Sequence, residues 1–182
     1  MKNKIHFTIL LVFFNCFLGF SQEDDFIFQS LSGLNKVSEA AEKLWSFFDS
    51  TDDKINKKKL IDMAVDLNLD ITDIIIEKQR ILSKIQNSST QETNLYSEIN
   101  NLELKTIQLK NTLQKHKDVI KAVGLDAAEI SSELKAEFSS KIFHLQTIKA
   151  NPKRKQKTIV YLQSGINILK GAKSVLNKFK LI

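Results

Sequence analysis

The stretch Leu60–Ile85, "LIDMAVDLNLDITDIIIEKQRILSKI", carries the clearest structural signal in this chain. An apolar series runs through it at alternating spacings of four and three residues, with Lys78 as the one polar interruption. The series consists of Leu60, Ala64, Leu67, Ile71, Ile74, Ile81 and Ile85. Such a seven-residue repeat predicts a helix with one apolar face, and it favours the left-handed packing of a coiled coil.

The repeat lapses over the polar segment 86–93 and then resumes in the same phase. The second series consists of Leu95, Ile99, Leu102, Leu109, Leu113, Ile120 and Val123. Because the phase is kept, one continuous helix over roughly 52–123 is allowed, and it would be on the order of 100 Å long. The alternative is a break near residues 87–90, where Asn, Ser and Thr favour a turn. We favour the break, and the continuous helix stays open.

Helical patterns also flank this region. Residues 26–48 and 126–148 carry apolar residues at three- and four-residue spacings, and so does the segment 153–182 that follows Pro152. The whole chain has five glycines and one proline, too few for the many turns of a sheet protein. We therefore predict an all-α fold, an elongated antiparallel bundle of four or five helices with coiled-coil (heptad) character. It would form a single helical domain over residues 22–182, ending in a basic helix over 153–182.

The first 21 residues have the pattern of a secretory signal peptide. Lys2 and Lys4 precede an apolar run over Phe7–Phe20, which is too short to span a bilayer comfortably. We therefore expect residues 1–21 to be removed and the protein to be periplasmic or extracellular. The only cysteine, Cys16, lies in this segment. The mature chain would then be cysteine-free, with no disulfide and no zinc–sulfur site.

Residues suited to catalysis are sparse. Beyond the N-terminal segment the histidines are His116 and His144. His116 falls on a position of the heptad series, which predicts a partly buried polar residue that helps to set the helix register. His144 has no second histidine or carboxylate cluster at ligand spacing, and the chain lacks a Gly-x-Ser-x-Gly motif and a glycine-rich phosphate loop. We therefore predict no enzymatic activity and no cofactor.

One acidic stretch, "DLNLDITDIIIE" over Asp66–Glu77, partly fits a calcium-loop template. Asp66, Asn68, Asp70 and Glu77 occupy template positions that carry oxygen ligands, but the glycine of the tight turn is replaced by Ile71. On a continuous helix the same region forms an acidic stripe instead. That stripe consists of Asp62, Asp66, Asp70, Asp73 and Glu77. We favour the helix, and calcium binding is the weaker alternative.

Charge is distributed unevenly along the chain. Residues 23–150 contain 17 Lys and Arg against 21 Asp and Glu, whereas residues 151–182 contain eight Lys and Arg and no acidic residue. The eight cations are Lys153, Arg154, Lys155, Lys157, Lys170, Lys173, Lys178 and Lys180. This asymmetry bears on partners and not on fold, so we take these residues as candidate contacts to an anionic partner.

Three interpretations of the basic segment compete. Nucleic acid is disfavoured because the protein is expected to be exported and because a single arginine lies among the eight cations. A basic amphipathic helix could lie on an anionic membrane surface. The third interpretation packs the apolar face of the last helix into the bundle and leaves its lysines solvated or near the acidic stripe.

These patterns predict an exported, non-enzymatic helical protein that acts by protein–protein contacts, as a structural or envelope-assembly component. Self-association is one form of this prediction, because long heptad seams need a partner helix. The first alternative is a membrane-surface-associated or membrane-active protein that uses the basic C-terminal helix. The second alternative is a periplasmic holdase-type chaperone.

Overall fold

The computed structural model describes residues 22–87, 95–135 and 152–181, and within these ranges the chain forms helices and no strand. Six of the elements are α-helices and the last is a 3₁₀ helix. They are α2 (Gln22–Ser50), α3 (Lys54–Asn87), α4 (Tyr96–Lys115), α5 (Lys117–Ala122), α6 (Ala127–Lys135), α8 (Pro152–Leu176) and the 3₁₀ helix η2 (Asn177–Leu181). The all-α prediction is confirmed, whereas the coiled-coil character remains a prediction. The predicted helix over 126–148 is described as far as Lys135, so His144 lies outside the described residues.

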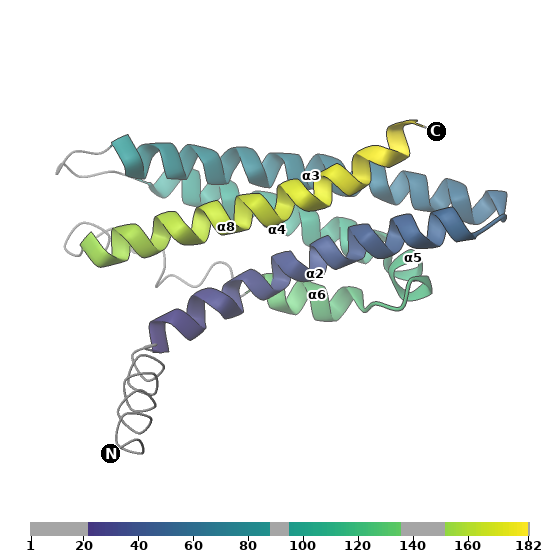
Figure 1. Cartoon of the computed structure of the whole chain (residues 1–182), viewed down its shortest axis with the longest axis horizontal. Helices are drawn as coiled ribbons and strands as arrows, with labels where there is room; N and C mark the ends of the chain where they lie inside the picture. The colour runs from purple at the N-terminus through teal and green to yellow at the C-terminus, as the bar shows by residue number, and fades with distance from the viewer. Residues whose placement is uncertain (1–21, 88–94, 136–151, 182) are drawn as a thin grey trace, which may run out of the picture.

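The helices α3 and α4 form an antiparallel hairpin (Figure 1). Lys84 pairs with Glu98 near the connection, and Asp66 pairs with Lys115 at the far end. The break favoured from the sequence is thus present, and the continuous helix over roughly 52–123 is wrong. The physical reason is burial, because a hairpin lets two successive apolar faces cover each other whereas one long helix would leave both exposed to water.

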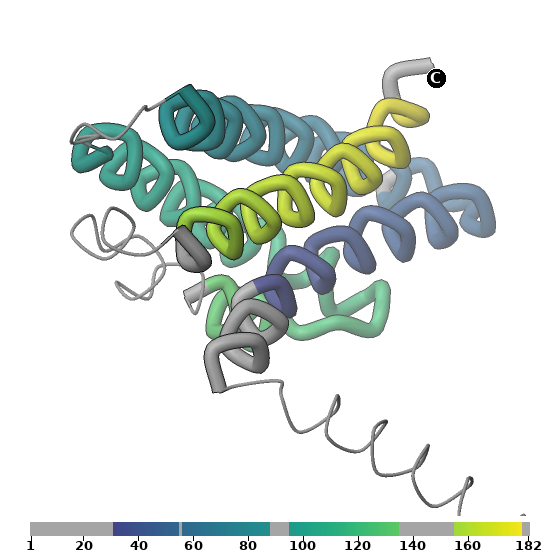
Figure 2. The backbone as a smooth tube through the Cα atoms, turned by 60° about the vertical axis from the view of Figure 1, so that its left-hand side comes forward, coloured from purple at the N-terminus to yellow at the C-terminus, as the bar shows by residue number. Residues whose placement is uncertain are grey.

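The helix α8 lies between α2 and α3 (Figures 1 and 2). It runs antiparallel to α3 but in the same direction as α2, since Gly165 lies against Leu34 and Phe179 against Phe48. The Phe48 and Phe179 ring centroids are 5.1 Å apart and meet edge to face, a geometry that stabilises aromatic pairs. The α2–α8 pair is therefore a parallel neighbour within a bundle whose other long pairs are antiparallel.

The heptad seam of α3 faces the interior of the bundle. Each apolar member of the Leu60–Ile85 series is buried, and so is Lys78. On α8 the inward face is likewise buried, and it consists of Tyr161, Leu162, Ile166, Leu169, Ala172 and Leu176. Burying one Leu or Ile fully contributes about 1.5–3 kcal/mol. The partner helices that the seams require are therefore supplied by the same chain.

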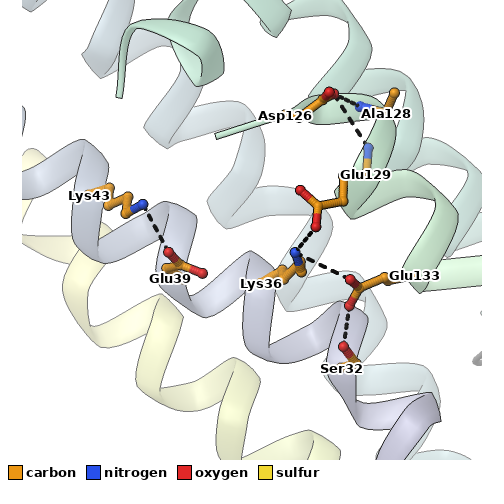
Figure 3. A network of polar contacts seen from close by, with 8 residues as sticks. All are labelled: Ser32, Lys36, Glu39, Lys43, Asp126, Ala128, Glu129 and Glu133. Carbon is orange, nitrogen blue, oxygen red and sulfur yellow. Dashed lines mark hydrogen bonds and ion pairs between the residues drawn. The ribbon is translucent and has the colours of Figure 1, made fainter. Parts of the chain in front are cut away.

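A glycine sets how closely α2 approaches α6. A Cβ at Gly33 would lie 2.6 Å from the backbone nitrogen of Leu134, a distance that real contacts do not reach. Ion pairs fasten the same two helices, because Lys36 on α2 pairs with Glu129 and Glu133 on α6, the latter at 3.2 Å (Figure 3). The hydrogen bond to Glu129 is the main cause that raises the pKa of Lys36.

Asp126 caps the start of α6. Asp126 precedes the helix, and its Oδ1 accepts a hydrogen bond of 2.7 Å from the backbone N–H of Ala128 (Figure 3). An aspartate at this position satisfies an N–H group that has no partner within the helix. The local signal of one residue therefore fixes where this helix begins.

Candidate interaction surface

The acidic stripe of α3 lies along α4. Asp73 Oδ2 lies 2.8 Å from Lys105 Nζ, and Asp66 Oδ2 lies 2.6 Å from Lys115 Nζ. The cations paired with these two acids thus come from α4 and not from the C-terminal helix, whose lysines the third interpretation left solvated or near the stripe. The stripe contributes to the pairing of the hairpin.

His116 occupies the joint between α4 and α5. Its Nε2 lies 2.8 Å from Asp66 Oδ2, and its side chain is 11% exposed, as expected for a partly buried polar residue on the heptad series. The hydrogen bond with His116, followed by that from Lys115, lowers the pKa of Asp66. One turn further on, burial raises the pKa of Asp70, whose Oδ2 is buried without a hydrogen-bond partner. Folding therefore favours the ionised form of Asp66 and disfavours the ionised form of Asp70.

The residues of the calcium template do not converge. Asp66, Asn68, Asp70 and Glu77 all lie inside the uninterrupted helix α3, so the tight turn of a calcium loop is not formed. Asn68 donates a hydrogen bond of 2.9 Å to Asn177 of η2, whereas Asp66 accepts one from Lys115 of α4. Within the described ranges no group of three or more His, Cys, Asp or Glu side chains is arranged to hold a metal ion.

Lys78, the polar member of the heptad series, is fully buried. Its Nζ lies 3.4 Å from the hydroxyl oxygen of Tyr161 and 4.7 Å from the centroid of that ring. Gly165 leaves room for the lysine, since a Cβ there would lie 3.3 Å from Nζ. A lysine over an aromatic face is attracted by the ring quadrupole, more strongly when water is excluded. This contact joins α3 to α8. The sequence pattern identified Lys78 as the polar interruption of the heptad series but did not indicate its contact with Tyr161.

The cations of the C-terminal segment lie outside the buried face of α8. Lys170 and Lys178 are exposed, and Lys155, Lys157 and Lys173 are partly exposed. Lys178 Nζ lies 5.2 Å from the Trp45 ring centroid. The structure does not describe the side chains of the remaining three predicted contacts, Lys153, Arg154 and Lys180. In the part of the chain that is described, no helix combines the length and the apolar character needed to cross a membrane.

Exposed apolar side chains gather on the outer sides of α3 and α4. On α3, Val65, Leu69 and Ile76 are 42%, 64% and 40% exposed, and we call these three residues the α3 stripe. On α4, Leu104 and Ile107 are 59% and 45% exposed. The α3 stripe and these two residues together form what we call the hairpin face.

An ion pair between α3 and α4 lies between the two parts of the hairpin face. Asp73, between Leu69 and Ile76 along α3, pairs with Lys105, the neighbour of Leu104 on α4. An open surface hollow also spans the two helices. It is lined by Glu77, Asn101, Leu104, Lys105, Ile107 and Gln108. The hairpin face is therefore a mixed apolar and polar surface that crosses from α3 to α4.

The sequence held a signal for the α3 stripe. Val65, Leu69, Thr72 and Ile76 form a second series at four- and three-residue spacings on the same helix. Two series with one spacing cannot be ranked by period alone, and only the packing of α8 and α4 shows which one is buried.

Comparisons with protein-family models, with curated proteins and with solved structures find no match to this chain, so no relative bears on the role of the hairpin face.

Proposed function

We propose that this protein is an exported, non-enzymatic helical protein that acts by contacts with a protein partner through the hairpin face. One observation carries the proposal. Among the described residues, five of the seven large apolar side chains that are exposed belong to the hairpin face. Gathered exposed apolar groups mark interaction sites, whereas scattered ones are ordinary.

The burial of the seams supports an outer contact surface. Leu67, Ile74 and Ile81 of α3 and Leu102 and Leu109 of α4 are fully buried within the chain. A partner that used these residues would have to open the bundle and expose them to water, at about 1.5–3 kcal/mol for each side chain. The hairpin face is accessible without that cost.

The expected export supports a role in a secreted or envelope assembly. The basic start, the apolar run over residues 7–20 and the lack of cysteine after residue 21 are typical of an exported chain that is held together by packing. A structural or assembly component needs a stable surface and no catalytic group, which agrees with the sparse catalytic residues of this sequence.

Site-specific photo-crosslinking in the producing cells tests the proposal. A photoreactive residue at Leu69 or at Leu104 should yield covalent adducts of higher mass, because both side chains would face the partner. The same residue at Val160, which is 47% exposed on α8, is the matched control and should give none. Equal yields at the three positions, or no adduct at any of them, would contradict the proposal.

A second candidate function is binding to an anionic membrane surface, favoured by the absence of any acidic residue from 151 to 182. The apolar face of α8 is covered by the bundle, so the folded protein would bind through lysines alone. Each lysine near an anionic surface contributes about 1 kcal/mol, and salt screens that attraction. Flotation with anionic and neutral vesicles decides the matter, since binding to neither would exclude this function.

A further inference from the structure

We propose that the partner of the hairpin face is a second copy of this chain, and that α3 packs antiparallel against α3 of that copy in a two-fold symmetric dimer. The inference rests on the proposed function and names its partner. It differs from self-association through the heptad seams, which are buried inside each copy.

The spacing of the α3 stripe fits a helical partner. Val65, Leu69, Thr72 and Ile76 follow one another at four, three and four residues along an uninterrupted helix. This is the spacing of a seam between two helices. A two-fold axis that passes between Asp70 and Ile71 would place Val65 against Ile76 of the second copy, and Leu69 against Thr72. The apolar residues would then cover each other in one register.

Charge selects the antiparallel direction. Asp62 and Arg80 stand at nearly equal distances on either side of the same point, about five helical turns apart, so both lie on the same edge of the α3 stripe. Around the two-fold axis each Asp62 would face Arg80 of the second copy, which gives two ion pairs. A parallel contact would leave Asp62 of one copy about five helical turns from Arg80 of the other, so neither ion pair would form.

Both side chains are placed to take part. Asp62 is exposed, and the side chain of Arg80 is 60% exposed although one of its nitrogens bonds Glu77. Their edge of the stripe is the one nearest α4, because Asp73 on that edge pairs with Lys105. The dimer contact would therefore extend from the α3 stripe toward Leu104.

Sedimentation equilibrium of the purified protein over a range of concentrations tests the dimer. The mass should correspond to two chains, and Leu69→Asp should raise the dissociation constant at least about a hundredfold, because a carboxylate would be buried without a partner in each copy. Val160→Asp places the same charge on α8 and should leave the dissociation constant unchanged. A monomer at every concentration, or equal constants for the two variants, would overturn the inference.

A charge exchange tests the direction of the contact. Asp62→Arg and Arg80→Asp should each weaken the dimer about tenfold, since each disrupts both symmetry-related pairs. The double variant should recover the affinity to within about threefold. A double variant weaker than either single variant would refute the antiparallel pairing. A photoreactive residue at Val65 adds a map of the register, with crosslinks near Ile76 expected and crosslinks near Val65 contradicting the inference.

The two proposals can fail separately. A monomeric purified protein that still gives adducts with other proteins at Leu69 in cells would overturn the dimer and leave the proposed function intact. A monomer without adducts at Leu69 and Leu104 would overturn both. Circular dichroism of each variant checks that a lost dimer is not simply an unfolded chain.

Discussion

Replacing Gly33 by alanine should destabilise the protein, whereas the same replacement at Gly171 should stabilise it. Both glycines lie inside α-helices, Gly33 in α2 and Gly171 in α8. A Cβ at Gly33 would approach the backbone of Glu133 and Leu134 at 2.6 to 2.8 Å, and a Cβ at Gly171 would meet no atom within 4 Å. The two substitutions are therefore identical in chemistry and opposite in the space available.

The magnitude follows from two effects. Alanine in place of glycine within a helix stabilises by about 1 kcal/mol, because the unfolded chain loses less conformational entropy on folding. Gly171→Ala should show this gain alone. At Gly33 the helices α2 and α6 must separate, and overpacking of this kind costs typically about 1–3 kcal/mol. The free energies of unfolding of the two variants should therefore differ by about 2 kcal/mol, with Gly33→Ala the less stable.

Urea denaturation followed by circular dichroism measures this difference, and thermal unfolding gives a second measure. For a chain of this size, 2 kcal/mol corresponds to a difference of about 4–8 °C in the unfolding midpoint. If Gly33→Ala unfolds at the same urea concentration as Gly171→Ala, or at a higher one, the close approach of α2 and α6 is not what requires glycine at position 33.

Four further predictions concern the polar side chains of Lys78, Asp66, Asp70 and Asp126. Lys78→Ala should lower the free energy of unfolding by about 2–4 kcal/mol through the cavity it leaves, whereas Lys78→Met should recover most of that loss because an apolar chain of similar length fills the site. Urea titration of both variants decides this, and a methionine variant as unstable as the alanine variant would mean that the contact with Tyr161 outweighs packing. The lowered pKa of Asp66 contributes stability that is present above its unfolded pKa of about 3.9 and is lost as pH falls through the folded value. Asp66→Asn should thus cost up to about 1 kcal/mol at pH 7 and less below pH 4. The pKa of Asp70 is raised by burial, so Asp70→Asn should leave the free energy of unfolding at pH 7 unchanged or raise it. Unfolding curves from pH 3 to pH 8 check both carboxyl variants. If Asp70→Asn were less stable than Asp66→Asn at pH 7, the opposite pKa shifts of the two carboxyl groups would be wrong. Asp126→Ala should destabilise by about 1 kcal/mol through loss of the cap of α6, and an unchanged melting temperature would show that the cap contributes nothing.

Several features of the fold could be predicted from short-range patterns. The four–three series of Leu60–Ile85 identified the buried face of α3, and the polar run after Ile85 located the end of that helix within a few residues. The role of His116 as a partly buried polar residue also followed from its register. These features depend on residues within one or two turns of each other, where spacing determines geometry.

The contacts between helices could not be predicted in the same way. The acidic stripe of α3 was visible, but whether Asp66 and Asp73 would meet α4 or the basic C-terminal segment depended on which helix lies on that side. The α3 stripe was a second series with the same spacing as the buried one. Local spacing does not show whether such a second face will be covered by another helix or remain in water.

The sequence by itself predicted an all-α fold, favoured a break near residues 87–90 and indicated which face of α3 is most apolar, because backbone hydrogen bonding and side-chain periodicity act over a few residues. Only the tertiary structure decided that α8 runs parallel to α2, that Gly33 admits the backbone of α6, and that Leu69 and Leu104 stay exposed. Those outcomes depend on covering all the apolar faces of one chain at once. The hydrophobic effect is non-directional, so the helix that covers each apolar face is determined by the packing of the whole bundle.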